Sequence, residues 1–538
     1  MIVPIIDIFA GPGGLGEGFS ALINPQTNQR LFKIVLSIEK DFYAHQTLQL
    51  RSFFRQFPPE QVPVEYYDFV KGRISQEELF EKWPKQSKNA HDEAWMAELG
   101  DGINAASNSI VDERIVKALN GHRNWLLIGG PPCQAYSVVG RSRRREIFLD
   151  EEKDERVGLY KQYLRILAVH NPAVFVMENV KGLLSARTEQ NSVFSKILND
   201  LTYPVDAYAS EYKNNGKQLD CPGYKIYSLV AEPRGYDLYE NPDFHFQDFV
   251  IHSEKYGIPQ TRHRVILLGI RNDIDLQPKV LEQRSEVPIS LVLSGLPRLR
   301  SSLSKVADNG EDWKDTIGKI LEKGILDGVD KDVTDEIIKK IDKISLPRTG
   351  AGKDYFCSKR ISSKYRPDWY LDNRLEGVSN HMSRGHMEDD LLRYFFASCF
   401  AKIKKRSPKL EDFPVALLPA HKNVKAGIEN KKFADRFRVQ LWNDPCKTVT
   451  SHISKDGHYY IHPDATQCRS FTVREAARIQ TFPDNYYFCG PRTSQFIQVG
   501  NAVPPLLANQ IARIVSAVFK TFNNQDNKEI KVDVPITI

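Results

Sequence analysis

The sequence predicts an α/β fold: a Rossmann-like sheet with helices on both faces, joined to a smaller irregular domain. A strand, a glycine-rich turn and a helix open the chain at residues 3–23. Apolar runs at Trp125–Ile128 and Ala173–Met177, separated by the helical spacing of Leu159–Val169, indicate further elements of a parallel sheet. Residues 298–435 lose this alternation, so we expect the smaller domain there.

The chain of 538 residues is long enough for two or three domains. The sequence pattern changes near Ser285, after which basic patches alternate with aromatic residues and turns. Such a surface suits the backbone and base edges of a nucleic acid, although most charged runs are only solvated faces. We predict a first domain over 1–290, a second over 291–440, and a return to the first over 441–538.

The composition is that of an ordinary water-soluble protein. Charged residues make up 26% of the chain, and the mean hydropathy is −0.42. No apolar run reaches about 18 residues, and the N-terminus lacks the basic start of a signal peptide. Seven scattered cysteines without a C-x-x-C pair favour neither a zinc site nor disulfides. We expect a cytoplasmic protein without a membrane span; the net charge of +6 is only weak support for a nucleic-acid partner.

The first unit has the layout of a nucleoside-binding loop. The strand Val3–Phe9 runs directly into a glycine-rich loop, in which missing side chains let a ligand approach the backbone. The second strand, Ile34–Ile38, ends at Glu39, whose carboxylate suits the two hydroxyls of a ribose. A nicotinamide or flavin dinucleotide fits the same spacing, and a plain tight turn is the simplest alternative. The loop alone does not identify the cofactor.

The segment 41–124 is longer than one strand–helix step requires. Tyr66–Val70 is predicted as the third strand, and residues 75–118 as a helical insertion. Asp68 and Asp101 are both candidates for contact with an adenine amino group, and the sequence does not decide between them.

A candidate nucleophile, Cys133, follows the strand Trp125–Ile128. Two glycines end that strand, and Pro131-Pro132 stiffen an extended loop at the edge where α/β sheets bind ligands. A buried structural cysteine is the alternative. The basic run at 140–145 favours instead an exposed thiol in a positive field, which promotes the reactive thiolate.

Two further motifs belong to the same edge. The strand Ala173–Met177 delivers Glu178 to the rim that carries Cys133, where a glutamate suits general acid work better than simple solvation. Arg262 and Arg264 are alternate residues at a strand and are expected to point together. Two guanidiniums on one face can grip phosphate or a base carbonyl, and a surface ion pair is the alternative.

The last hundred residues return to regular structure. A capped helix followed by a proline stop is predicted at 472–483. Residues 498–505 then open a final amphipathic helix, Leu506–Phe519, and the polar tail after Asn523 is expected to fray.

Six of these motifs, in this order, resemble those of the DNA (cytosine-5)-methyltransferases of the prokaryotic restriction-modification type. The resemblance covers nearly the whole chain. It rests on DIFAGPGGLGEGFS at 7–20, GGPPCQAYS at 129–137, ENV at 178–180, QTRHR at 260–264, REAARIQTFPD at 474–484 and QVGNAVPP at 498–505. The segment 298–435 falls where that family keeps its target recognition domain. The long insertion and the extended recognition region depart from the family, so contacts there cannot be carried over.

The resemblance implies a site for S-adenosyl-L-methionine and double-stranded DNA, with no metal. Cys133 would add to C6 of a flipped cytosine while Glu178 holds N3, and Arg262 and Arg264 would hold the base and its phosphate. The implied cofactor-binding residues are Phe9, Gly11, Gly13, Gly14, Leu15, Gly16, Glu39, Pro131, Asn501 and Val503. The implied DNA-binding residues are Gln134, Ser137, Arg141, Arg143 and Gln260.

Three other functions fit parts of the sequence. A related class methylates cytosine in transfer RNA, but the large segment 298–435 favours duplex DNA. A silent DNA-binding regulator on the same fold is opposed by the intact Cys133, Glu178 and Arg264, and a dinucleotide oxidoreductase is supported only by the glycine loop. The sequence specifies neither the recognition sequence nor a cognate restriction endonuclease, and we expect a monomer on DNA.

Overall fold

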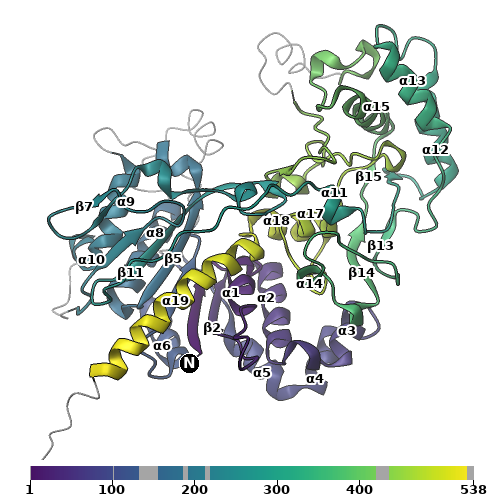
Figure 1. Cartoon of the computed structure of the whole chain (residues 1–538). Coiled ribbons are helices and arrows are strands. Elements are labelled where there is room, and N and C mark those ends of the chain that lie inside the picture. The colour runs from purple at the N-terminus through teal and green to yellow at the C-terminus, as the bar shows by residue number, and fades with distance from the viewer. Residues whose placement is uncertain are drawn as a thin grey trace, which may run out of the picture.

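The structure is a computed structural model that describes residues 2–100, 102–131, 155–185, 192–211, 219–419 and 435–529. Its centre is an eight-stranded mixed sheet (Figure 1) with the strand order β3-β2-β1-β4-β5-β11-β6, in which β9 also pairs with β11. Strands β1 to β5 are parallel, whereas β11 runs antiparallel to β5, β6 and β9. The strands are β1 (Val3–Ile8), β2 (Phe32–Glu39), β3 (Ala94–Met96), β4 (Leu126–Gly129), β5 (Val174–Val180), β6 (Tyr224–Tyr227), β9 (Val250–His252) and β11 (His263–Arg271).

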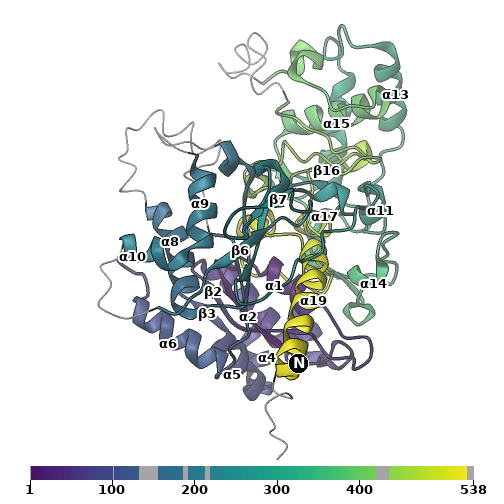
Figure 2. The ribbon, with the colours of Figure 1, turned by 60° about the vertical axis from the view of Figure 1, so that its left-hand side comes forward.

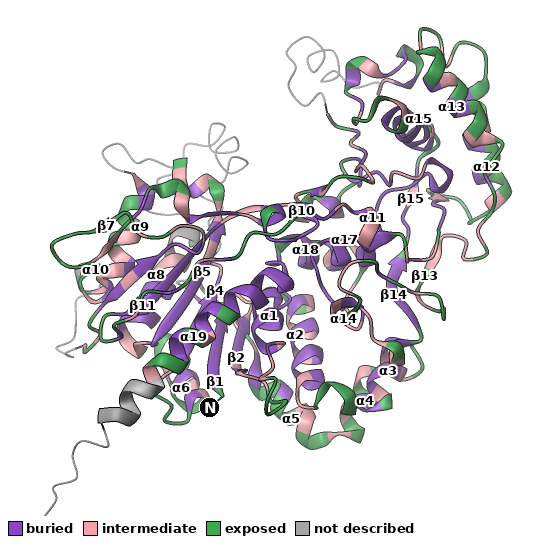
Figure 3. Cartoon of the chain, viewed as in Figure 1, coloured by how far each residue is buried: buried purple, intermediate pink, exposed green. Residues whose placement is uncertain are grey.

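The central strands are buried along their length because their sequences are nearly continuous apolar runs. Every residue of β1 and β4 is buried, as the purple strands of Figure 3 show. The strands predicted at Val3–Phe9, Trp125–Ile128 and Ala173–Met177 are therefore confirmed, to within a few residues at their ends.

Helices cover both faces of the sheet, as predicted. Figure 2 shows α6 and α8 on one side of the sheet and α1 and α19 on the other, and α19 packs along α1. These helices are α1 (Gly14–Ser20), α6 (Asn108–Leu119), α8 (Glu155–His170) and α19 (Pro505–Glu529). Two further helices, α9 (Val193–Thr202) and α10 (Pro204–Glu211), pack against α8.

The prediction of a third strand at Tyr66–Val70 is wrong. This segment is a helix, α3 (Val64–Val70), whose buried Tyr66, Tyr67 and Val70 share one helical face. Packing overrides the strand propensity of these residues: the Tyr66 ring meets Phe54 of α2 (Phe42–Arg55) at 4.9 Å between centroids.

The third parallel strand is β3, which lies inside the segment predicted as a helical insertion. Residues 75–118 do contain α4 (Gln76–Lys82), α5 (Pro84–Glu93) and most of α6. However, Ser37 to Glu39 of β2 pair with β3 in parallel register, so this segment completes the sheet rather than standing outside it.

A second group of helices lies away from the sheet (Figure 1) and has its own hydrophobic core. It contains α12 (Gly310–Gly318), α13 (Lys331–Ile341) and α15 (Glu388–Lys404), with the antiparallel pair β13 (Gly352–Cys357) and β14 (Gly377–Met382) nearby. The core runs from Trp313 to Cys468, so residues on both sides of position 440 contribute to it.

The C-terminal segment returns to the sheet through α17 (Val473–Ile479), α18 (Arg492–Asn501) and α19. Helix α17 begins with a capping box between Thr472 and Glu475, which confirms the capped helix. The run Arg492–Phe522 is long and apolar enough to cross a membrane, but 78% of its apolar window is buried inside the protein, as in a core helix. Helix α19 continues to Glu529, beyond the predicted fraying point at Asn523.

Candidate active site

A cavity of about 490 Å³ opens at the carboxyl edge of the sheet, where the strand order reverses between β1 and β4. This size lies within the range of about 300–1,000 Å³ typical of small-molecule sites. Its walls come from the loops after β1, β2 and β4, from the end of β5, and from residues 500–503. Open α/β sheets bind their ligands at this topological switch point.

The glycine loop packs against the C-terminal segment so closely that Gly14 has no room for a side chain. Gly13 has φ +87°, and a Cβ on Gly14 would overlap the carbonyl oxygen of Val503. Gly11 has φ +56°, with open space where its Cβ would lie. Only glycine reaches these backbone conformations and contacts without strain.

Glu39 connects the end of β2 to the glycine loop. One carboxylate oxygen accepts from the Gly11 N–H at 2.8 Å, and the other accepts from the Asp41 N–H at 2.8 Å. Burial raises the pKa of the Glu39 carboxyl, while these backbone donors oppose the rise. Each oxygen retains a lone pair, so the carboxylate can still accept from ligand hydroxyls.

Most of the predicted cofactor residues line this one cavity. Phe9 does so from a left-handed backbone conformation with φ 55°, which is rare for an aromatic residue and marks a constrained position. Those at the cavity wall are Phe9, Gly11, Gly14, Leu15, Glu39, Pro131, Asn501 and Val503. Gly13 and Gly16 do not line it and instead allow the close packing of α1; a Cβ on Gly16 would approach Asp7 to 3.1 Å.

A glutamate and an arginine meet in the wall of the cavity. Arg264 Nε lies 2.8 Å from Glu178 Oε1, and both side chains are more than four-fifths buried. Gly130 leaves this carboxylate accessible, since a Cβ there would come within 3.1 Å of Glu178 Oε2. The antiparallel pairing of β5 with β11 brings the two side chains together, and Arg264 holds the Glu178 carboxylate in one orientation.

Arg262 lines the same cavity as Arg264, as predicted, but from the interior. Its Nη1 donates to the Val449 carbonyl at 2.8 Å and to the Gly500 carbonyl at 3.2 Å, and its buried Nε has no partner among the described residues. Burial, together with repulsion from Arg264, lowers the pKa of this guanidinium to about 9. A negative group brought into the cavity would therefore be stabilised by it.

Gln260 is buried completely, and its position favours a structural role over the predicted contact with DNA. The amide group donates to Gln480 and to the Ile479 carbonyl, and its oxygen accepts from the Val449 N–H at 3.1 Å. It therefore joins three segments that are far apart in the sequence.

Asp68 does not reach the cavity and cannot meet an adenine there. It lies on α3 and pairs with Arg73 at 2.8 Å. The other candidate, Asp101, lies outside the described residues, although Leu99 lines the cavity two residues earlier. Cys133, Gln134, Ser137, Arg141 and Arg143 also lie outside the described residues.

Sequence reasoning missed Asp7 as a site residue. It is buried at the end of β1, lines the cavity, and has one oxygen without a partner among the described residues. Burial raises the pKa of its carboxyl to about 8. The available signal was a single charged residue inside an otherwise apolar strand.

The fold and the cavity define an α/β enzyme with a ligand site at the switch point of its sheet. The family model for C-5 cytosine-specific DNA methylase matches residues 104–213 and 236–517, more than half of the chain. The chain therefore belongs to the C-5 cytosine-specific DNA methylase family, and it is an enzyme of the DNA (cytosine-5-)-methyltransferase class.

Several named relatives match over most of their length. The type II methyltransferase M.Bpa9945I of Bacillus paralicheniformis is 33% identical over 96% of this chain and 98% of its own. The type II methyltransferase M.DdeI of Desulfomicrobium norvegicum is 26% identical over 98% and 92%. The DNA (cytosine-5-)-methyltransferase M.ApeKI of Aeropyrum pernix is 26% identical over 74% and 82%.

Proposed function

We propose that this enzyme transfers a methyl group from S-adenosyl-L-methionine to C5 of a flipped cytosine in a specific sequence of duplex DNA. The observation that carries the proposal is the Glu178–Arg264 pair, which lies in the wall of the same cavity as the glycine loop and Pro131. Cys133 follows Pro131 by two residues, so chain length alone keeps their Cα atoms within about 7 Å.

The cavity fits a nucleoside cofactor. Phe9 would lie against the adenine, Glu39 would accept from the ribose hydroxyls, and Asn501 and Val503 would border the cofactor. The contact between Gly14 and Val503 closes the cavity from both ends of the chain. S-adenosyl-L-methionine supplies an activated methyl group on a sulfonium when it is bound.

Cys133 and Glu178 would divide the chemistry at the base. Cytosine is a poor nucleophile at C5, so the Cys133 thiolate adds to C6 while Glu178 holds or protonates N3. The resulting enamine carbon at C5 would take up the methyl group as the bond from that methyl to the cofactor sulfur breaks, which leaves the sulfur as a neutral thioether. A base, such as a water molecule, would then take the C5 proton; the electron pair of that C–H bond restores the C5–C6 double bond and expels the Cys133 thiolate.

Arg264 and Arg262 would bind the base and its phosphate. Arg264 already fixes the Glu178 carboxylate, and the buried charge of Arg262 favours an anion in the cavity. Gln134, Ser137, Arg141 and Arg143, which precede or belong to the basic run at 140–145, would contact the DNA. Cys133 cannot reach a paired base, so the cytosine must leave the stack, as in methyltransferases generally.

We propose that the recognition domain is 291–440, between catalytic segments at 1–290 and 441–538, and that the enzyme acts as a cytoplasmic monomer. The relatives' designation as type II methyltransferases supports a cognate restriction endonuclease as partner. The recognition sequence depends on a few side chains that read base edges.

The test is transfer of labelled methyl groups from S-adenosyl-L-methionine to plasmid DNA and to transfer RNA, followed by bisulfite sequencing. We expect label on cytosine C5 at one short recurring DNA sequence. Cys133→Ala should lose transfer but retain cofactor binding, whereas Cys357→Ala, which changes an exposed cysteine, should keep both. Label on RNA alone would assign the transfer RNA reaction. DNA binding without any transfer would indicate a silent regulator.

A further inference from the structure

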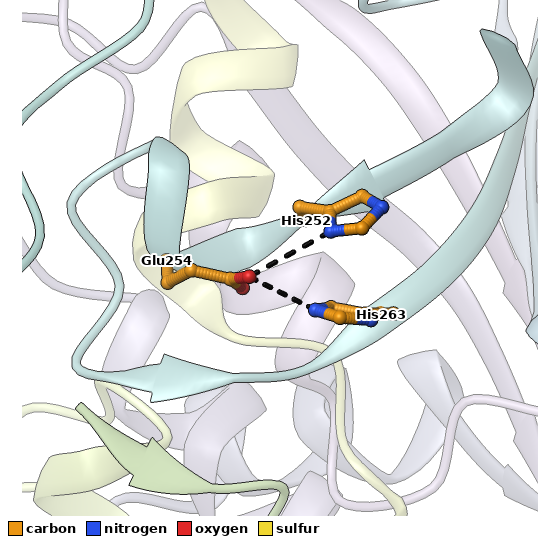
Figure 4. A group of neighbouring side chains, drawn as sticks. All are labelled: His252, Glu254 and His263. Carbon is orange, nitrogen blue, oxygen red and sulfur yellow. Dashed lines mark hydrogen bonds and ion pairs between the residues drawn. The ribbon is translucent and has the colours of Figure 1, made fainter.

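Three metal-ligating side chains meet outside the cavity, on the strands that lead to the arginine pair. They are His252 on β9, Glu254 in the short helix Ser253–Lys255, and His263 on β11. Their ligand atoms all lie within 4.8 Å of one another. Figure 4 shows the carboxylate of Glu254 beside the two imidazole rings, directed toward a nitrogen of each.

Strand register places these groups together. His252 and His263 are direct partners in the antiparallel pairing of β9 with β11, so their side chains leave the same face of the sheet. Their ring centroids are 3.9 Å apart. Since side chains alternate along a strand, His263 points away from the face used by its neighbours Arg262 and Arg264.

The carboxylate of Glu254 is only half satisfied. Its Oε1 accepts from His263 Nε2 at 2.9 Å and lies 3.7 Å from His252 Nδ1. Its Oε2 is buried and has no hydrogen-bond partner among the described residues, and Glu254 as a whole is only 8% exposed. A buried carboxylate oxygen without a partner is unfavourable, and a cation would satisfy it.

We propose that His252, Glu254 and His263 bind one divalent transition-metal ion of the Zn²⁺ class. Two imidazoles and one carboxylate are a common ligand set for Zn²⁺, with bonds of about 2.0–2.2 Å. Mg²⁺ and Ca²⁺ prefer oxygen ligands, so the imidazoles select against them. The imidazole side chains are 36% and 31% exposed, which leaves room for the ion to arrive and for water to complete its coordination.

The bound ion would brace the segment that carries the arginine pair. It would link β9 and the short helix to the first residue of β11, and the His263 carbonyl accepts from Arg264 Nη1 at 2.9 Å. Lys181 and Lys255 add positive charge near His252, which opposes weakly held cations. The site therefore depends on the strong bonds of imidazole to metal rather than on net charge.

The test measures metal directly and does not depend on methyl transfer. The full chain without a histidine tag is stripped with a chelator, exposed to excess Zn²⁺, desalted, and its bound metal counted by mass spectrometry. We expect one tightly held equivalent, together with a higher thermal midpoint in Zn²⁺ that Mg²⁺ does not reproduce. Glu254→Gln and His263→Ala should each weaken Zn²⁺ binding more than about tenfold in chelator competition.

His122→Ala is the matched control, because His122 is exposed and lies outside the cluster; it should retain the equivalent. Co²⁺ in place of Zn²⁺ should give visible bands without a thiolate charge-transfer band, which separates this site from cysteine ligands. The proposal is overturned if the wild type retains no equivalent, a result that needs no variant. It is also overturned if folded Glu254→Gln and His263→Ala proteins, checked by circular dichroism, retain it undiminished.

Discussion

Replacing Asp7 by Asn should stabilise the protein increasingly as the pH rises. Asp7 lies buried at the end of β1, and burial raises the pKa of its carboxyl from 3.8 to about 8. Arg55 lowers this pKa, but its guanidinium is already 2.6 Å from Glu93, and Glu39 adds further repulsion. The carboxyl is therefore protonated in the folded protein at neutral pH and ionised in the unfolded chain.

The sign and size follow from this difference in pKa. Because the folded pKa is the higher one, the contribution of Asp7 to stability is fully present below about pH 4. It is lost as the pH rises towards about 8. Each unit of pH within this window costs about 1.4 kcal/mol, so the wild type loses about 2.7 kcal/mol between pH 5 and pH 7 through this group alone. An asparagine at this position cannot ionise, so the Asp7→Asn variant does not lose this stability as the pH rises.

The assay is urea unfolding of the wild type and Asp7→Asn at pH 5, 6 and 7, followed by tryptophan fluorescence. The difference in unfolding free energy between the two proteins at pH 5 is compared with the difference at pH 7. Any pH-independent cost of fitting the amide into the strand cancels in this comparison. Ser37→Ala, at a buried residue of β2 that pairs with Asp7 and has no carboxyl group, is the matched control and should show no such change. An Asp7→Asn difference that is the same at pH 5 and pH 7 would refute the reasoning.

Three other substitutions test the site. Glu178→Gln should lower the methyl-transfer rate by about 100-fold or more with unchanged cofactor affinity in equilibrium dialysis, and an unchanged rate would exclude its acid role. Gly14→Ala should weaken cofactor binding more than about tenfold by calorimetry, since its Cβ would displace Val503, while Gly235→Ala, where the Cβ meets open space, should not. Gln260→Ala should lower the thermal midpoint without changing DNA affinity, because it leaves buried polar groups without hydrogen-bond partners, at about 1–3 kcal/mol each. Reduced DNA affinity at an unchanged thermal midpoint would instead support the predicted contact of Gln260 with DNA.

The sequence was most informative where one segment alone determines the local structure. Continuous apolar runs predicted β1, β4 and β5, and strand ends correctly located Glu39 and Glu178 at one edge of the sheet. A carboxylate in the last residues of a buried strand lies at this edge because the strand fixes its position and direction. For this reason most of the residues predicted at this edge of the sheet do line one cavity, and their roles toward a cofactor stay predictions.

Predictions failed where distant packing decides. Tyr66–Val70 has strand-like residues, but the helix is favoured because one face of it packs on α2. Gln260 belongs to a polar motif, and nothing local indicates that it is completely buried. The His252–His263 pair depends on the register between β9 and β11, which the spacing of eleven residues does not reveal.

Residues 500–503 form part of the cavity wall, and the hydrogen bonds to them and to Val499 show why the C-terminal segment must return to the sheet. Gln480 Nε2 donates to the Val499 carbonyl at 2.6 Å and to the Ala502 carbonyl at 3.1 Å, and Arg262 holds the Gly500 carbonyl from a position 238 residues earlier. These carbonyls are buried, so each would cost about 1–3 kcal/mol without its donor. The wall formed by residues 500–503 is thus stable only when the segments that carry Arg262 and Gln480 have folded together with it. Folding of the whole chain, rather than of the first half alone, completes the cavity.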